Sequence, residues 1–332
     1  MKKYKLNIIL LVIISFVVLF FSLKDNFSDA INYFIHLNYF WIIIAIFFYL
    51  LNVFFQSLSQ FRFLREVKED YTFLSCFKLM IMAMFFNGIT PFSSGGQPFE
   101  VYLLNKEGIK VSDSANALLQ NFITYQFSLI FIGTLALVLN SFLNIIPSNL
   151  VLKNVVIIGY IINVTVMLII ILFSRGKKLN TKIFTKVFNF IFKLKIIKNR
   201  EEKKIKAEKL LDDFYNSTAI MKNNFKNTLL SIFYNILSLV CLYIIPVFVF
   251  LALNKNMSFR DSFVASAYTF LIGSFVPIPG GSGGLEYAFI DFFKSFYKGG
   301  LLSASMLLWR LITYYVGIII GGITLITYRK KE

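Results

Sequence analysis

The sequence predicts an all-α, polytopic integral membrane protein with about six full membrane spans and two re-entrant helical hairpins. Hydrophobic residues make up 57% of the 332 residues, and the mean hydropathy is +0.71. The apolar residues fall into stretches of about 20, the length of helix that crosses a bilayer. Two further apolar regions are interrupted by turns rich in proline and glycine. These three observations predict one membrane domain over residues 1–332.

Six apolar stretches are long enough to be full spans. They lie near residues 6–23, 38–59, 115–139, 153–173, 227–253 and 301–327. The first follows Lys2, Lys3 and Lys5 and is not followed by the small-residue pattern of a signal-peptide cleavage site. We therefore expect it to be retained as a span.

The regions 72–110 and 258–298 are predicted to form the two hairpins. The turn Pro91-Phe-Ser-Ser-Gly-Gly cuts the first region, and the turn Pro279-Gly-Gly-Ser-Gly-Gly cuts the second. Backbone groups left unpaired at membrane depth are stable only where protein encloses them or where they line a polar cavity. The alternative is that each region makes two full crossings, which would give about ten spans.

The distribution of basic residues predicts the topology. With a cytoplasmic N-terminus, 26 of the 34 Lys and Arg residues fall in cytoplasmic segments, as membrane proteins prefer. The C-terminus is then also cytoplasmic, the first hairpin enters from the cytoplasm and the second enters from outside. An inverted repeat is thus predicted, with one half over residues 38–139 approximately and the other over 227–327 approximately. This arrangement places a transporter's binding site between its halves.

The segment 175–226 carries fifteen basic residues. It is predicted to be either a basic amphipathic helix on the inner leaflet or a solvated linker that enforces orientation. Either form would attract anionic lipid headgroups. Because a topological bias explains the formal net charge of +17, we do not expect nucleic acid to be a partner.

The hairpin turns supply the first candidate binding groups. A helix that starts after each turn would point its N-terminus at the membrane interior, with Pro98 at the first position of the first such helix. Free N–H groups at such helix ends favour anions. We therefore expect backbone N–H groups to bind a lipid phosphate at Gly95, Gly96, Gly283 and Gly284, and we place Gln97 at the same helix start.

Charged side chains supply the second set. Glu100 and Glu286 lie in the first helical turns, where they either cap their own helices or bind a cationic group or a proton during transport. Arg310 lies nine residues into the last span, too deep for a flanking residue. It needs a partner, and Glu286 and Asp291 are the candidates.

Other kinds of site are not predicted. Cys76 and Cys241 lie within apolar segments and His36 is the only histidine, so neither a metal site nor a disulfide framework is indicated. We expect no catalytic residues, no metal and no cofactor.

The blocks Asn87–Glu100 and Pro277–Glu286 together resemble the lysylphosphatidylglycerol synthase transmembrane-region family. This family includes the flippase-like half of the multiple peptide resistance factor. The resemblance implies a bacterial plasma-membrane protein that moves aminoacylated phosphatidylglycerol, or a related anionic or lipid-linked headgroup, between leaflets and so confers resistance to cationic antimicrobial peptides. Larger members add a soluble domain that transfers lysine to the lipid. This sequence ends soon after its last span, so we expect a stand-alone member without that activity.

The expected partners are phospholipid and the bilayer, with a separate lipid synthase and a second copy of the chain as further candidates. Three alternatives to lipid translocation remain at this point. They are a membrane-embedded phosphatidylglycerol lysyltransferase, a scaffold that docks a synthase through residues 175–226, and a secondary transporter of a small solute.

Overall fold

The computed structural model describes residues 27–90, 94–147, 150–176, 209, 212, 213, 215, 224–273 and 279–329. Every regular element in these ranges is helical, which confirms the predicted all-α membrane class. Five helical stretches there are long and apolar enough to cross a membrane: Tyr39–Val67, Val111–Leu143, Asn154–Leu172, Phe225–Ala252 and Gly299–Tyr328. They coincide with five of the six predicted spans. The sixth, at 6–23, lies outside the described residues, as does most of segment 175–226.

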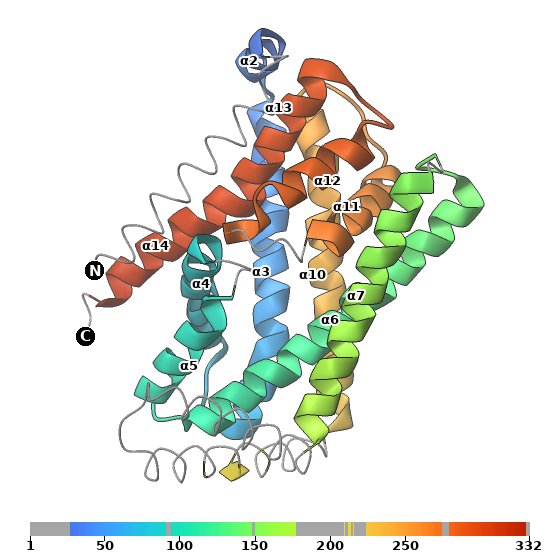
Figure 1. Ribbon diagram of the computed structural model, residues 1–332. Coiled ribbons are helices and arrows are strands. Elements are labelled where there is room, and N and C mark those ends of the chain that lie inside the picture. The colour runs from blue at the N-terminus through green and yellow to red at the C-terminus, as the bar shows by residue number, and fades with distance from the viewer. Residues whose placement is uncertain are drawn as a thin grey trace, which may run out of the picture.

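Two long helices form an antiparallel pair at the centre of the molecule (Figure 1). They are α3 (Tyr39–Val67) and α10 (Phe225–Ala252), and the short helix α2 (Phe27–Ile35) precedes them. At one end, the backbone N–H of Asn38 donates to the carbonyl of Ala252 at 2.8 Å. At the other end, the Asn227 side chain donates to Glu66. This pair is the frame against which the other helices pack.

Each Pro-Gly region forms a pair of short helices. The first pair is α4 (Phe73–Ile89) and α5 (Gly96–Lys106); the second is α11 (Phe259–Gly273) and α12 (Gly284–Phe293), with the 3₁₀ turn η2 (Pro279–Gly281) before α12. The longest of them, α4, has 17 residues and spans about 25 Å at 1.5 Å per residue. A hydrocarbon core is about 30 Å thick, so these lengths favour hairpins that enter and leave on the same side.

The two hairpins open toward opposite ends of the α3–α10 pair (Figure 1). The first begins just after α3, close to the start of α10. The second begins after α10, and the Tyr297 hydroxyl beyond α12 donates to the carbonyl of Asn256. Their inner ends meet, because η2 packs against α4. The end of α4 and the start of the second hairpin's returning helix thus lie close together within the bundle.

Three further stretches enclose the hairpins. They are α6 (Val111–Leu143), α7 (Leu150–Arg175) and the last crossing, which consists of α13 (Gly299–Arg310), the π-helical turn η3 (Leu311–Tyr315) and α14 (Val316–Arg329). Helix α6 packs against α11, and α14 packs against α4. The last span was expected near 301–327, and within it the structure has a π turn directly after Arg310.

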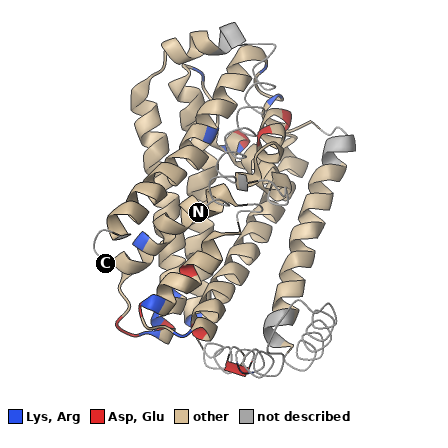
Figure 2. Ribbon diagram, turned by 60° about the vertical axis from the view of Figure 1, so that its left-hand side comes forward, with Lys and Arg blue, Asp and Glu red and all other residues tan. Residues whose placement is uncertain are grey.

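Charged residues gather toward the ends of the bundle and leave long uncharged stretches between them (Figure 2). Where the first hairpin opens, the Lys68 Nζ donates to the carbonyl of Glu107 at 3.0 Å. Burial raises the pKa of the Glu107 carboxyl, while a hydrogen bond from Tyr71 and the charge of Lys68 oppose the shift. The opening of this hairpin is therefore fixed by polar contacts.

Candidate functional site

A buried ion pair lies at the start of α12. Arg310 Nε donates to Glu286 Oε1 at 2.7 Å, and the two side chains are only 5% and 9% exposed. Of the two partners expected for Arg310, the structure selects Glu286. Asp291 instead pairs with Lys294, one turn along α12. Isolated charges at this depth are costly, so each member of the pair requires the other.

The local sequence explains why Glu286 points at Arg310. Gly283 precedes α12 with φ of 86°, in the left-handed region that favours glycine. Its backbone N–H donates to Glu286 Oε2 at 2.7 Å, which leaves Oε1 for the guanidinium. The carboxylate thus caps its own helix, one of the roles considered for it from the sequence, and binds Arg310 at the same time. Its binding of a ligand cation or of a proton during transport stays a prediction.

Arg310 also holds the turn of the second hairpin. Its Nη2 donates to the carbonyl of Gly280 at 3.0 Å and to Ser282 Oγ at 3.2 Å. The guanidinium carbon lies 4.6 Å from the centre of the Tyr314 ring, close enough for a cation–π contact. Arg310 therefore ties the last crossing to the hairpin turn through charge, hydrogen bonds and ring contact.

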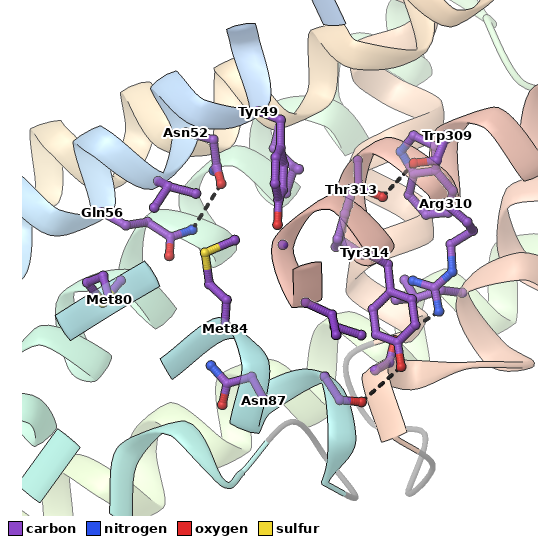
Figure 3. Close-up of a pocket in the computed structure, with 18 residues that line it drawn as sticks. Tyr49, Asn52, Gln56, Met80, Met84, Asn87, Trp309, Arg310, Thr313 and Tyr314 are labelled. Carbon is purple, nitrogen blue, oxygen red and sulfur yellow. Dashed lines mark hydrogen bonds between the residues drawn. The ribbon is translucent and has the colours of Figure 1, made fainter. Parts of the chain in front are cut away.

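Tyr314 connects the two hairpins. Its hydroxyl donates to the carbonyl of Gly88 at the end of α4, at 2.8 Å (Figure 3). Its ring also lies against Gly280, where an added Cβ would come within 2.0 Å of the Tyr314 ring carbon Cε2. The side chain is thus wedged between the inner ends of both hairpins. Nothing in the sequence around Tyr314 distinguishes it, because the contact depends on the π turn.

The glycine N–H groups of the first turn are not free for a ligand, contrary to our expectation. The N–H of Gly95 donates to Thr90 Oγ1 and that of Gly96 to Asn87 Oδ1, both at 2.8 Å. Helix α5 begins at Gly96, so Pro98 is its third residue and not its first. A helix N-terminus can be capped by side chains, and here α4 supplies the caps. With the N–H of Gly283 bound to Glu286, three of the four expected phosphate donors are occupied.

Two cavities lie between the hairpins. The smaller, of about 220 Å³, is lined by Tyr49 and Asn52 of α3, by α4 and by the Arg310–Tyr314 region (Figure 3). The larger, of about 450 Å³, reaches from Gly280 and Gly281 to Gln97 and Glu100. Both share a wall of seven residues: Gln56, Met80, Met84, Asn87, Phe270, Gly280 and Leu285. Arg310 lines one chamber and Glu100 the other.

Glu100 is 5% exposed and ends a chain of hydrogen bonds. Asn235 Nδ2 donates to Ser59 Oγ at 2.8 Å, Ser59 donates to Asn121 Oδ1 at 2.7 Å, and Asn121 donates to Gln60 at 3.4 Å. Gln60 Nε2 in turn donates to Glu100 Oε2 at 3.3 Å. Polar side chains of α3, α6 and α10 therefore lead to this carboxylate, and among the described residues no cation pairs with it.

The structure thus divides the expected site residues. Gln97, Glu100 and Arg310 line the cavities, and Glu286 holds Arg310. Gly284 is the first residue of α12, and Asp291 lies seven residues further along that helix. Asn52 and Asn121 make the interhelical hydrogen bonds that polar residues on spans often make, yet both also line a cavity.

Comparison with known proteins supports a shared architecture. The sequence model of a family described as "Lysylphosphatidylglycerol synthase TM region" matches residues 7–321. A UPF0104 membrane protein of Archaeoglobus fulgidus is 25% identical over 264 residues, which are 76% of this chain and 76% of the relative. A UPF0104 membrane protein of Methanocaldococcus jannaschii is 26% identical over 272 residues, 78% of this chain and 76% of the relative.

Proposed function

This chain belongs to the lysylphosphatidylglycerol synthase TM-region family, and from that premise we propose that it moves a phospholipid headgroup between the two leaflets of a membrane. The lipid we propose is aminoacylated phosphatidylglycerol or a related anionic or lipid-linked lipid. No lysine-transfer step is part of the proposal.

The observation that carries the proposal is the cavity between the inner ends of the two hairpins, whose wall includes many polar side chains among apolar ones. A headgroup that crosses a bilayer must exchange its water for polar protein groups, because the hydrocarbon core offers none. The larger cavity supplies such groups from α3, α5, α6, α7 and α10. Binding sites of secondary transporters commonly lie where interrupted helices meet at the membrane midplane.

Arg310 and Glu286 are the residues we propose to respond to the lipid. In the described state, the guanidinium is neutralised by Glu286. A lipid phosphate in the smaller cavity would compete with the carboxylate for it, since charge-assisted hydrogen bonds form with either group. If Arg310 turned from Glu286 to the phosphate, its hydrogen bonds to Gly280 and Ser282 would also be disturbed. The second hairpin would then be held less firmly.

We further propose that both chain termini face the cytoplasm, together with the end of the bundle where the first hairpin opens. The basic residues of that end include Arg62, Arg65, Lys68, Lys106 and Lys110. Positive residues accumulate on the cytoplasmic side of membrane proteins. The second hairpin then opens on the other side of the membrane.

Leaflet exchange of fluorescent phosphatidylglycerol and fluorescent lysylphosphatidylglycerol in proteoliposomes tests the function. We expect the native chain to exchange at least one of them faster than protein-free liposomes. Glu286→Gln should slow exchange roughly tenfold or more, because it removes the charge that balances Arg310 while keeping an acceptor for the Gly283 N–H.

The matched control is Asp291→Asn. It makes the same chemical change on the same helix, but in a side chain paired with Lys294 and outside both cavities. It should exchange lipid at the native rate. Native-like exchange by Glu286→Gln, or equal losses in both variants, would refute the role given to the ion pair, and no exchange of either lipid by the native chain would refute the proposed function.

A further inference from the structure

The larger cavity has an unusual lining for a membrane-embedded space. Six helices contribute carboxamide side chains to it. The most buried of these are Gln60 of α3, Gln126 of α6, Asn163 of α7 and Asn235 of α10. Polar side chains inside a membrane bundle are costly unless they are hydrogen-bonded, so a cavity that collects them calls for an explanation beyond helix packing.

Two of these carboxamides have unused hydrogen-bonding groups. Gln126 is 5% exposed and makes no hydrogen bond with any described residue. Asn163 is fully buried; its Nδ2 donates to the carbonyls of Gly159 and Leu271, but its Oδ1 has no partner among the described residues. Buried polar groups normally find partners. A ligand in the cavity would supply them.

The charge of the lining restricts that ligand. Glu100 is the only ionisable acid or base of the described residues that line the larger cavity, apart from the Tyr125 phenol. Arg310 lies in the other chamber and is neutralised by Glu286. A phosphate inside the larger cavity would therefore find no counter-cation among the described residues that line it. The part of a headgroup that enters must be uncharged or cationic.

Carboxamides discriminate between these two classes. Each carries both donors and acceptors, which match hydroxyl groups because a hydroxyl also donates and accepts. An ammonium group, in contrast, only donates, and it would leave the NH₂ group of Gln126 unpaired. The aromatic rings of Phe122, Tyr125 and Phe270 line the same cavity and provide apolar surface for carbon–hydrogen faces.

We infer that the larger cavity binds the uncharged, hydroxyl-bearing part of a lipid headgroup, a glycerol or a sugar, through Gln126, Asn163 and Glu100. The inference rests on the proposed lipid translocation and specifies its substrate class. The cavity volume of about 450 Å³ lies in the range of about 300–1,000 Å³ that is usual for small-ligand sites. A site built to pair hydroxyl groups rejects analogues that lack them, because its own polar groups then stay unpaired.

Lipid binding to the full chain in detergent tests this inference directly. The dissociation constant is obtained from the rise in melting temperature as dioleoyl lipids are added. Phosphatidylglycerol is compared with phosphatidylmethanol, which has the same charge and no headgroup hydroxyl, and glucosyldiacylglycerol represents a sugar without phosphate. We expect phosphatidylglycerol, glucosyldiacylglycerol or both to bind more tightly than phosphatidylmethanol, and the tighter of the two identifies the source of the hydroxyls.

Gln126→Leu is the diagnostic variant. Because Gln126 has no partner among the described residues, its removal leaves no protein group unpaired and should not unfold the chain. It should weaken binding of the hydroxylated lipid about two- to tenfold, the effect of one neutral hydrogen bond, and leave phosphatidylmethanol unchanged. Gln120→Leu is the control, since Gln120 lies on the same helix, bonds to Asn116 and lies outside both cavities.

The outcomes separate this inference from the proposed function. Equal binding of all three lipids, or native binding by Gln126→Leu, would overturn the inference even if leaflet exchange is fast. A hydroxyl preference that Gln126→Leu abolishes would uphold it, and absence of leaflet exchange in the same preparation would then count only against translocation.

Discussion

Arg310 shows how a single buried charge can organise a membrane protein. Its three side-chain hydrogen bonds reach Glu286, Gly280 and Ser282, all within one short segment of the second hairpin. The desolvation cost of a buried cation is large, and it is offset only when the partners are complete. The same residue contacts the Tyr314 ring, which in turn binds Gly88 of the first hairpin.

We predict that Arg310→Ala lowers the free energy of unfolding by about 3–5 kcal/mol, since it leaves Glu286 buried without its partner. The double variant Arg310→Met with Glu286→Leu should lose clearly less, because no uncompensated charge remains. Thermal or denaturant unfolding in detergent measures both. If Arg310→Ala unfolds like the native chain, the pair contributes little to the fold.

At this scale, part of the site could be predicted from the sequence. The depth of Arg310 in its span predicted a partner, and the position of Glu286 made it a candidate. The occupied N–H groups of Gly95 and Gly96 could not be predicted, since their acceptors, Thr90 and Asn87, reach them only once the hairpin has closed. Gln126 and Asn163 gave no signal, because only the packed helices show which of their polar groups stay unused.

Among the elements, the two helical hairpins distinguish this fold from a simple bundle. Their helices have 10 to 17 residues, whereas a helix that crosses a hydrocarbon core has about 20, with a range of about 17–25. The re-entrant course of both regions stays a prediction. The positions of five spans followed from apolar stretches of sufficient length. The π turn after Arg310 did not, since apolar periodicity is nearly the same in an α-helix with and without one such turn. Turns of this kind often occur at functional sites.

The hairpin assignment predicts which side of the membrane each loop faces. Four variants each carry one new cysteine. Asp70→Cys and Lys110→Cys mark the two ends of the first hairpin, and Lys255→Cys and Lys298→Cys mark the two ends of the second. A membrane-impermeant thiol reagent should label the first two variants from one side of the membrane and the other two from the opposite side. All four positions are exposed, and the native Cys76 and Cys241 are buried.

A cysteine at the turn of the first hairpin tests the alternative, in which each region makes two full crossings. With re-entrant hairpins, the turn stays within the membrane, so a cysteine at the exposed Ser94 should be labelled far more slowly than Asp70→Cys. Ready labelling of Ser94→Cys from the side opposite to Asp70→Cys would contradict the hairpin and favour about ten spans.

For the molecule as a whole, the hairpins, the central helix pair and the last crossing enclose two adjoining chambers that are lined by polar and apolar side chains. The packing is reciprocal: the first hairpin contacts α14, and the second contacts α6. An inverted repeat of about 38–139 and about 227–327 requires such reciprocity, and the repeat remains a prediction. The sequence indicated the membrane class and the breaks, whereas the chambers arise from side chains far apart along the chain.

The lipid headgroup is proposed to cross the membrane between the two hairpins, with its uncharged part in the larger chamber, so blocking this chamber tests the proposed passage. Val166 of α7 lines the chamber, and Leu168, two residues further, is 51% exposed on the outside of the bundle. Leaflet exchange is measured in proteoliposomes with Val166→Trp and with Leu168→Trp, after both are shown to melt like the native chain. Val166→Trp should exchange lipid no faster than protein-free liposomes, while Leu168→Trp should match the native rate. Native-rate exchange by a folded Val166→Trp would refute the passage of the headgroup through this chamber.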